Sequence, residues 1–255
     1  MGATKIEWTD MTWNPVIGCR RISAGCEHCY AERMAGRLAH IHSRGTAGYD
    51  EVVHWAENET ERGWNGRVAM RSHLLDQPKE WRRGRRVFVS SMGDLFYKEV
   101  PHGWIRDVVG VVEACPQHRF LFLTKRPSSM ALAFRDLGRV PANAWLGTTV
   151  ENRLNMGRIA DLVSIRAAVH FLSLEPMLEA MDLSPYLGDI EWVIVGCESG
   201  PGRRPARWPW VEHVVEQCRA AGVPCFVKQL GLMDGRVIHP GDRGWPGWAK
   251  QERPR

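Results

Sequence analysis

Phe120-Leu121-Phe122-Leu123-Thr124 is a short apolar run that is followed by two cationic residues, Lys125 and Arg126. An unbroken apolar run, with no polar residue at alternate positions, indicates a strand buried on both faces of a parallel sheet. Five further runs have the same character: Arg86–Ser90, Ala144–Thr148, Val169–Ser173, Trp192–Gly196 and Cys225–Lys228. Successive runs begin about 23 to 34 residues apart, which is the length of one strand with its returning helix.

Helical patterns occupy the stretches between these runs. We expect helices over residues 104–114, 128–137, 151–166 and 210–221, with prolines at two helix starts and Gly222 at the last helix end. An earlier strand is expected over Thr12 to Ile17, followed by a helix from Cys29 to His42. No Gly-x-Gly-x-x-Gly or P-loop follows any run, which argues against a nucleotide-binding Rossmann fold. The sequence therefore predicts one α/β domain over residues 1–255, a complete or partial (β/α) TIM-like barrel, with an unassigned insertion at about 43–80.

The composition is that of an ordinary globular protein. The chain has 255 residues, of which 44% are hydrophobic and 25% charged. No apolar run approaches the roughly 18 residues that a membrane span requires. The first seven residues lack the apolar core of a signal peptide. We therefore expect a cytoplasmic protein without a membrane partner.

The net charge of +5 permits a polyanionic partner. The basic residues gather in three places: residues 82–86, residues 203–207 and the tail from Lys250 to Arg255. Such clusters are often only solvated surface, and they are also typical of nucleic-acid contacts. A nucleic acid is therefore a candidate partner.

Polar residues end each expected strand. In a barrel, chemistry takes place on the loops at the carboxyl ends of the strands. Six successive ends of this kind predict a shared polar pocket, although Ser and Thr also cap helices. The candidate site residues are Ser91, Asp94, Lys125, Arg126, Thr148, Ser173, Glu175, Glu198 and Lys228.

Three of the seven cysteines, Cys19, Cys26 and Cys29, follow the first expected strand with the spacing C-x6-C-x2-C. A C-x2-C pair can place two thiolates on one metal, and the loop supplies a third ligand. Three protein ligands leave one position open. On zinc this position suits a water, and on a cubane cluster it is an iron that can bind substrate or cofactor. A zinc site could also take His28, His40 or His42 as its fourth ligand.

The first strand, the cysteine loop and the helix after it resemble the radical S-adenosylmethionine superfamily. The whole chain resembles a phage-associated and bacterial three-cysteine-motif family of unknown function. The matching stretches are residues 6–10, 13–15, 25–32, 91–96, 123–127, 145–147, 173–176, 192–196 and 198–201. The superfamily loop is usually C-x3-C-x2-C, whereas the first gap here has six residues. Met92-Gly93-Asp94 stands in place of the superfamily's Gly-Gly-Glu.

The resemblance implies a [4Fe–4S] cluster on Cys19, Cys26 and Cys29, whose fourth iron chelates S-adenosylmethionine. Reduction by an electron donor that the sequence does not identify would give a 5′-deoxyadenosyl radical, which takes a hydrogen atom from substrate. The roles expected are amino-group binding for Ser91 and Asp94, carboxylate binding for Lys125 or Arg126, and ribose binding for Thr148, Ser173 and Glu175. Glu198 and Lys228 are expected to contact substrate or transfer a proton.

The substrate is not identified by the sequence, and the basic clusters favour a nucleic acid or nucleotide. Three alternatives stay open at this point. The first is a zinc enzyme on the same barrel. The second is a non-catalytic metal-containing protein that binds nucleic acid. The third is a cluster enzyme that binds another substrate at the open iron.

Overall fold

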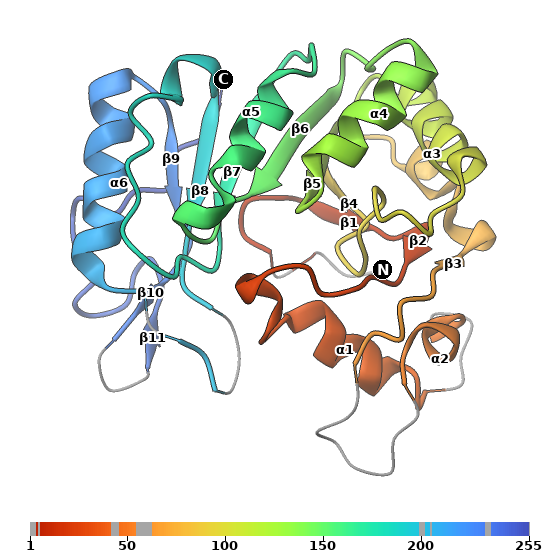
Figure 1. Cartoon of the computed structure of the whole chain (residues 1–255), viewed down its shortest axis with the longest axis horizontal. Coiled ribbons are helices and arrows are strands. Elements are labelled where there is room, and N and C mark those ends of the chain that lie inside the picture. Colours follow the sequence, from red (N-terminus) through yellow and green to blue (C-terminus); the bar gives the residue numbers. More distant parts are fainter. Residues whose placement is uncertain are drawn as a thin grey trace.

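A seven-stranded parallel sheet is the centre of the molecule (Figure 1). The computed structural model describes residues 4, 6–41, 46–54, 63–198, 202–204, 206–232 and 236–254. The strands are β1 (Met11–Trp13), β4 (Arg86–Val89), β5 (Arg119–Thr124), β6 (Ala144–Thr149), β7 (His170–Leu174), β8 (Trp192–Val195) and β9 (Cys225–Val227). They lie side by side in chain order, and the sheet curls into half of a barrel. Within the described residues no ladder joins β9 to β1, so the barrel is partial.

Four helices cover the outer face of the sheet: α3 (His102–Ala114), α4 (Pro127–Leu137), α5 (Gly157–Val163) and α6 (Trp208–Ala221). Their apolar faces and the outward side chains of the strands form the largest buried cluster. The helix expected over residues 151–166 is shorter than predicted, because a 3-10 turn at Arg153–Asn155 precedes α5. β7 and β8 are joined without an α-helix, through a 3-10 turn at Leu187–Asp189.

Aromatic rings fill the concave face of the sheet. The centroids of Trp8 and Phe88 are 4.7 Å apart, and Trp192 lies 5.9 Å from Phe171 and 6.2 Å from Phe226. A Cβ at Gly147 would lie 2.4 Å from the Phe171 ring, so this strand position needs glycine.

The two ends of the described chain lie together beside this core. Gln251 forms an isolated bridge with Phe226 of β9 and donates to the Glu7 carboxylate at 3.1 Å. The Trp192 indole donates to Glu252 O at 2.9 Å, and Arg253 donates to Glu7 O at 2.9 Å. The tail therefore connects β9 to the segment that precedes β1.

A smaller module packs beside the carboxyl ends of the strands. It contains α1 (Tyr30–Leu38), α2 (Tyr49–Val52) and an antiparallel pair of β2 (Val16–Ile17) and β3 (Ala69–Met70), with 3-10 turns at Ser72–Leu74 and Gln77–Glu80. Ile17, α1, α2, Trp64 and Ala69 share an apolar cluster of their own, whereas Leu75 in the turn region packs against the main core. The described part of the expected insertion at 43–80 is therefore divided between the smaller module and the main core.

The single strand expected over residues 12–17 is wrong. Pro15, which has no N–H, separates β1 in the main sheet from β2 in the smaller one. In the described part of the chain, no helix has the length and apolar character that crossing a membrane would require.

Candidate functional site

A pocket opens at the carboxyl ends of the strands and holds about 1060 Å³ of space unfilled by atoms, including open solvent at its mouth. All three predicted metal ligands and all but one of the other predicted site residues line it. Those lining residues are Cys19, Cys26, Cys29, Ser91, Asp94, Lys125, Arg126, Ser173, Glu175, Glu198 and Lys228. They come from the cysteine loop and from the ends of five strands, so residues far apart in the sequence meet at one place.

Thr148 is the predicted site residue that does not line the pocket. It is fully buried, and its hydroxyl donates to Thr124 O at 2.9 Å. Thr149 lines the pocket instead. Side chains alternate along a strand, and Trp145 and Gly147 of β6 already face the concave side. The prediction therefore chose the wrong member of the Thr pair, and the alternation from Trp145 could have identified Thr149.

The cysteine loop, residues 18–29, begins where β2 ends. Gly18 has a φ of +97°, and a Cβ there would lie 2.3 Å from Arg67 O. Its N–H donates to Met92 O, and its carbonyl accepts from Asp94 N–H, at 3.2 and 3.3 Å. These bonds place the loop against residues 92–94 after β4. The loop ends where Cys29 caps the start of α1.

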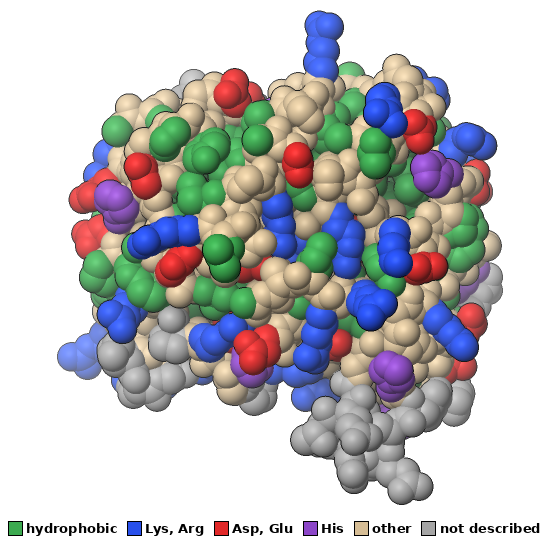
Figure 2. Space-filling view, viewed as in Figure 1, with side chains coloured by type: hydrophobic (Ala, Val, Ile, Leu, Met, Phe, Trp, Pro, Cys, Tyr) green, Lys and Arg blue, Asp and Glu red, His purple; other side chains and the backbone are tan. Residues whose placement is uncertain are grey.

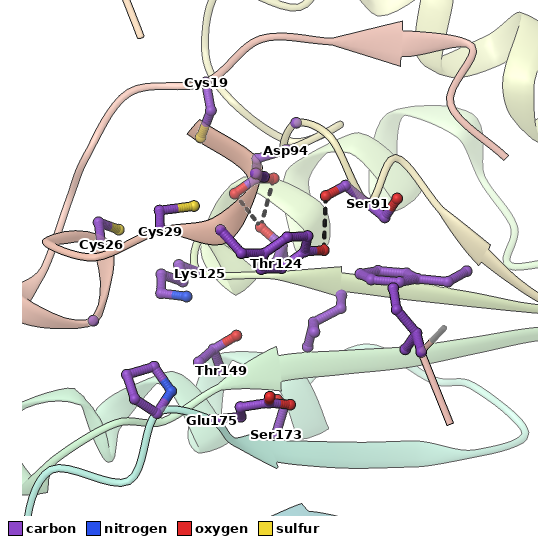
Figure 3. A pocket seen from close by; sticks show the side chains of 18 of the residues that line it. Cys19, Cys26, Cys29, Ser91, Asp94, Thr124, Lys125, Thr149, Ser173 and Glu175 are labelled. Carbon is purple, nitrogen blue, oxygen red and sulfur yellow. Dashed lines mark hydrogen bonds between the residues drawn. The ribbon is translucent and has the colours of Figure 1, made fainter. Parts of the chain in front are cut away.

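The three thiols stand at the edge of the pocket (Figure 3). Cys26 and Cys29 lie next to each other, and Cys19 lies beside Asp94. Burial raises the pKa of Cys19 to about 12, with Asp94 adding to the effect and Arg126 opposing it. Burial also raises the pKa of Cys29, and the Lys125 cation opposes this. Burial therefore favours the neutral thiol form of both Cys19 and Cys29 by raising the pKa of each.

Asp94 organises the wall next to Cys19. Its carboxylate accepts hydrogen bonds from the Thr124 hydroxyl at 2.8 Å and from Phe96 N–H at 3.0 Å, and it pairs with Arg126 at 2.8 Å. Figure 3 shows Thr124 directly below Asp94. A carboxylate has about four acceptor positions. Asp94 therefore holds Thr124, Phe96 and Arg126 in place. Few of its acceptor positions remain for the amino group of S-adenosylmethionine that it was expected to bind.

Arg126 is also committed to the protein. One guanidinium nitrogen donates to Asp94 and, at 3.7 Å, to the sulfur of Cys19, and the other donates to Arg20 O at 2.6 Å. The guanidinium also lies over the ring of Tyr97. Lys125 and Arg126 were both expected to bind a ligand carboxylate. Arg126 instead connects the cysteine loop to the end of β5.

Glu198 and Arg204 form a second fastening. Arg204 donates from its backbone N–H to Glu198 at 2.7 Å, pairs with the same carboxylate through its side chain, and reaches Glu27 and Ala24 O at 2.8 Å. Burial pushes the pKa of Glu198 upward, but the bonds and charge of Arg204 outweigh it and leave the pKa below its ordinary value. Glu198 is thus a paired carboxylate and not an open proton acceptor.

Glu151, which follows β6, was not among the predicted site residues. It is fully buried, and its carboxylate accepts hydrogen bonds from the Ser23 hydroxyl and from Gly25 N–H, the latter at 3.3 Å. The Arg158 guanidinium forms an ion pair with the same carboxylate at 2.7 Å. The sequence pattern alone does not distinguish Glu151 from a surface residue. Its pairing with Arg158 is seen only in the folded structure.

The chain matches a family model described as "Protein of unknown function (DUF5131)" over residues 3–243. The chain belongs to the DUF5131 family. A comparison with curated proteins finds no match, and a comparison with solved structures finds none either.

In this DUF5131 protein three polar groups in the pocket have no hydrogen-bond or ion-pair partner among the described residues: the Lys125 ammonium and the hydroxyls of Thr149 and Ser173. Figure 3 shows Lys125 below Cys26 and Cys29, with Thr149 and Ser173 farther along the same pocket. Glu175 and Lys228 pair with each other. The pocket thus offers a cation and two hydroxyls to a ligand, over an apolar floor of Trp8, Phe88 and Leu123.

The two internal basic clusters lie at opposite ends of the strands. Arg82, Arg83 and Arg85 are exposed at the amino end of β4, away from the pocket. Arg204 is on the pocket side but is occupied by Glu198 and Glu27. Figure 2 shows lysine and arginine side chains spread across the middle of one face, so positive charge is not confined to either cluster.

Proposed function

We propose that this protein is an iron–sulfur enzyme in which Cys19, Cys26 and Cys29 hold a [4Fe–4S] cluster and S-adenosylmethionine occupies the pocket beside it. One observation carries the proposal. The three cysteines and the unpartnered polar groups of strands β5 to β7 line the same pocket, at the end of a parallel half-barrel where ligands bind in such folds.

The donor set fits a cluster better than a single zinc ion. Thiolates are the usual ligands of iron–sulfur clusters, and three of them leave one iron open. Among the residues that the structure describes, no group of three or more His, Cys, Asp or Glu side chains is arranged to hold one metal ion, and this applies to the three cysteines as much as to a zinc ligand set. His28 lines the pocket, His40 is exposed after α1, and His42 lies outside the described residues.

When both groups are bound, a reduced cluster supplies the reductive cleavage of the sulfonium and the hydrogen-atom abstraction that follows from it. The chain's own residues bind and orient. Lys125 is the free cation for a ligand carboxylate, and Thr149 and Ser173 offer hydroxyls to a ribose. Trp8 and Phe88 exclude water from the floor. Asp94 acts indirectly, because it pairs with Arg126 and so holds Arg126 against the cysteine loop.

Glu175 and Lys228 are the groups that we assign to the substrate end of the pocket. The Lys228 ammonium donates to Glu175, and Gln229 donates to the same oxygen at 3.3 Å. The two side chains are each 18% exposed, so a substrate can reach them. A proton can be held on Lys228 or accepted at Glu175.

Anaerobic reconstitution with iron and sulfide tests the proposal. The protein should take up about four irons and four sulfides per chain, as one cubane requires. Cys26→Ala should lose the cluster absorbance, because one of three protein ligands is removed. Cys115→Ala is the matched control, since Cys115 is buried at the end of α3 outside the pocket. Stoichiometric zinc without iron uptake would overturn the cluster proposal and favour the zinc enzyme.

A further inference from the structure

Glu175 and Lys228 meet across the end of β8, in one wall of the pocket. The last residues of β7, β8 and β9 are paired in register, and the residues that follow them are Glu175, Gly196 and Lys228. Lys228 continues the ladder, because its N–H donates to Val195 O at 2.9 Å. Gly196 has no side chain, so the carboxylate and the ammonium on either side of it form an ion pair across this position.

This ion pair leaves hydrogen-bonding capacity on both of its members. The Oε1 atom of Glu175 accepts from Lys228 and from Gln229, whose Nε2 also donates to Cys197 O at 2.9 Å. Among the residues that the structure describes, Oε2 of Glu175 receives no hydrogen bond, and the Lys228 ammonium uses one of its three donors. The pair therefore presents an acceptor and donors side by side, at the edge of the pocket.

A ligand group that meets this pair has to be uncharged. Each of the two side chains is only 18% exposed. A ligand carboxylate would compete with Glu175 for Lys228, and a ligand ammonium would compete with Lys228 for Glu175. Either would leave one charge of the pair without its partner, which is costly away from solvent. A neutral group that both accepts from Lys228 and donates to Glu175 keeps the ion pair intact.

The ligand group also needs its donor and its acceptor on the same side. A trans peptide bond does not provide this, because its N–H and C=O point in opposite directions. A heterocycle with a donor and an acceptor on adjacent atoms does provide it. Nucleobases have such edges, and proteins that take up single bases read these edges by hydrogen bonds and pack the flat ring against aromatic or apolar side chains.

An aromatic layer lies directly below the ion pair. Lys228 is two residues beyond Phe226, so the two side chains face the same, concave side of the sheet. Trp8 lines the pocket and packs against Phe171 of β7, with ring centroids 6.4 Å apart. Figure 3 shows Glu175 beside Ser173, which is two residues beyond Phe171. A flat ring that lies against this layer can turn its edge toward the ion pair.

We propose that Glu175 and Lys228 bind the hydrogen-bonding edge of a nucleobase, so that the substrate is a nucleoside or a base in a nucleic-acid strand. This inference rests on the proposed function, because it takes the pocket as the substrate site of an enzyme. Base binding involves no covalent step and no iron. It can therefore be measured on the protein with and without a cluster.

Calorimetric titration with uridine and 3-methyluridine tests the site. The N3–H of uridine can donate to Glu175, whereas the methylated ring cannot. Reconstituted protein with bound S-adenosylmethionine should bind uridine at least tenfold more tightly than 3-methyluridine, because a hydrogen bond to a charged group is lost. The double variant Glu175→Met, Lys228→Met leaves neither charge unpaired and should lose this discrimination. The matched control is Glu113→Met, Arg139→Met, which removes an ion pair on the surface.

Equal affinity of the wild type for the two nucleosides, or full discrimination in the double variant, would overturn the base site. Uridine that binds only when S-adenosylmethionine is absent would assign the ion pair to the adenine of the cofactor and overturn it too. The same titration on iron-free protein separates the two proposals, since discrimination without iron uptake would retain the base site and overturn the cluster.

A uridine trinucleotide distinguishes the two sources of the base. Binding that is tighter than that of uridine and weakens with salt would assign the base to a strand, because phosphate contacts release counterions. Binding equal to that of uridine would assign it to a free nucleoside. Either result supports the base site, and a trinucleotide and a nucleoside that both fail to bind would overturn it.

Discussion

At the scale of single residues, the pocket separates side chains that hold the site together from those left free to bind. Asp94 and Glu198 both line the pocket, and both have their carboxylates occupied by an arginine. Lys125 is the opposite case. It lies among cysteines and hydroxyls, and no described acidic group pairs with it. The Lys125 ammonium, which lines the pocket and has no partner among the described residues, is therefore the strongest candidate for binding an anionic group of a ligand.

Replacing Lys125 by methionine keeps the apolar stem and removes the charge. We expect reconstituted Lys125→Met to bind S-adenosylmethionine at least tenfold more weakly, because a hydrogen bond to a charged group contributes about 1.5 to 3 kcal/mol. Its iron content should equal that of the wild type, since Lys125 holds no part of the cysteine loop. Lys98→Met is the control, because Lys98 is exposed and pairs with Glu99 on the surface. Unchanged affinity in calorimetry would remove Lys125 from the ligand site.

At the scale of elements, three strand ends fasten the cysteine loop. Arg126 after β5 binds Arg20 O, Glu151 after β6 binds Ser23 and Gly25, and Arg204 after β8 binds Ala24 O. Each fastening reaches a different part of the loop. The protein itself thereby holds the loop in position, which lowers the ordering cost of binding a ligand there.

Glu151→Ala should destabilise the protein by about 3 to 5 kcal/mol in urea unfolding, because it leaves the Arg158 charge buried and unpaired. It should also speed loss of iron to a chelator, since Ser23 and Gly25 lose their anchor. Glu113→Ala provides the comparison. Glu113 pairs with Arg139 on the surface, where such a pair contributes at most about 1 kcal/mol. Iron retention equal to that of Glu113→Ala would show that the loop does not depend on Glu151.

The elements also show how far the sequence predicts this structure. Unbroken apolar runs located β4 to β9 within one or two residues, because a strand buried on both faces needs them. The break at Pro15 was missed, since a proline between Trp13 and the apolar pair Val16-Ile17 is compatible with one bent strand. The pocket residues followed from their places at strand ends. Which of them are already paired could not be predicted, because Arg204 meets Glu27 across 177 residues of chain.

At the scale of the whole molecule, the half-barrel has an open side between β1 and β9, and the segment before β1 fills it from within. Trp8 is 3% exposed and packs against Phe88 at 4.7 Å and against Phe171 and Trp192 at 6.4 Å. Glu7, next to it, accepts hydrogen bonds from Gln251 and Arg253 of the tail. Trp8 therefore contributes both to the core and to the floor of the pocket. Glu7, beside it, connects this segment to the tail.

Removing this indole tests whether the open half-barrel depends on it. Trp8→Ala should lower the free energy of unfolding by about 3 to 5 kcal/mol, the usual cost of truncating a buried aromatic side chain. The ligand should bind more weakly as well, because water would reach the pocket floor through the cavity. Trp210→Ala is the matched control, since Trp210 is half-buried on α6 beneath Arg207, and its loss should cost less and leave the pocket unchanged. If the two variants unfold at the same urea concentration, the core between β1 and β9 does not need Trp8, and other contacts must close the half-barrel.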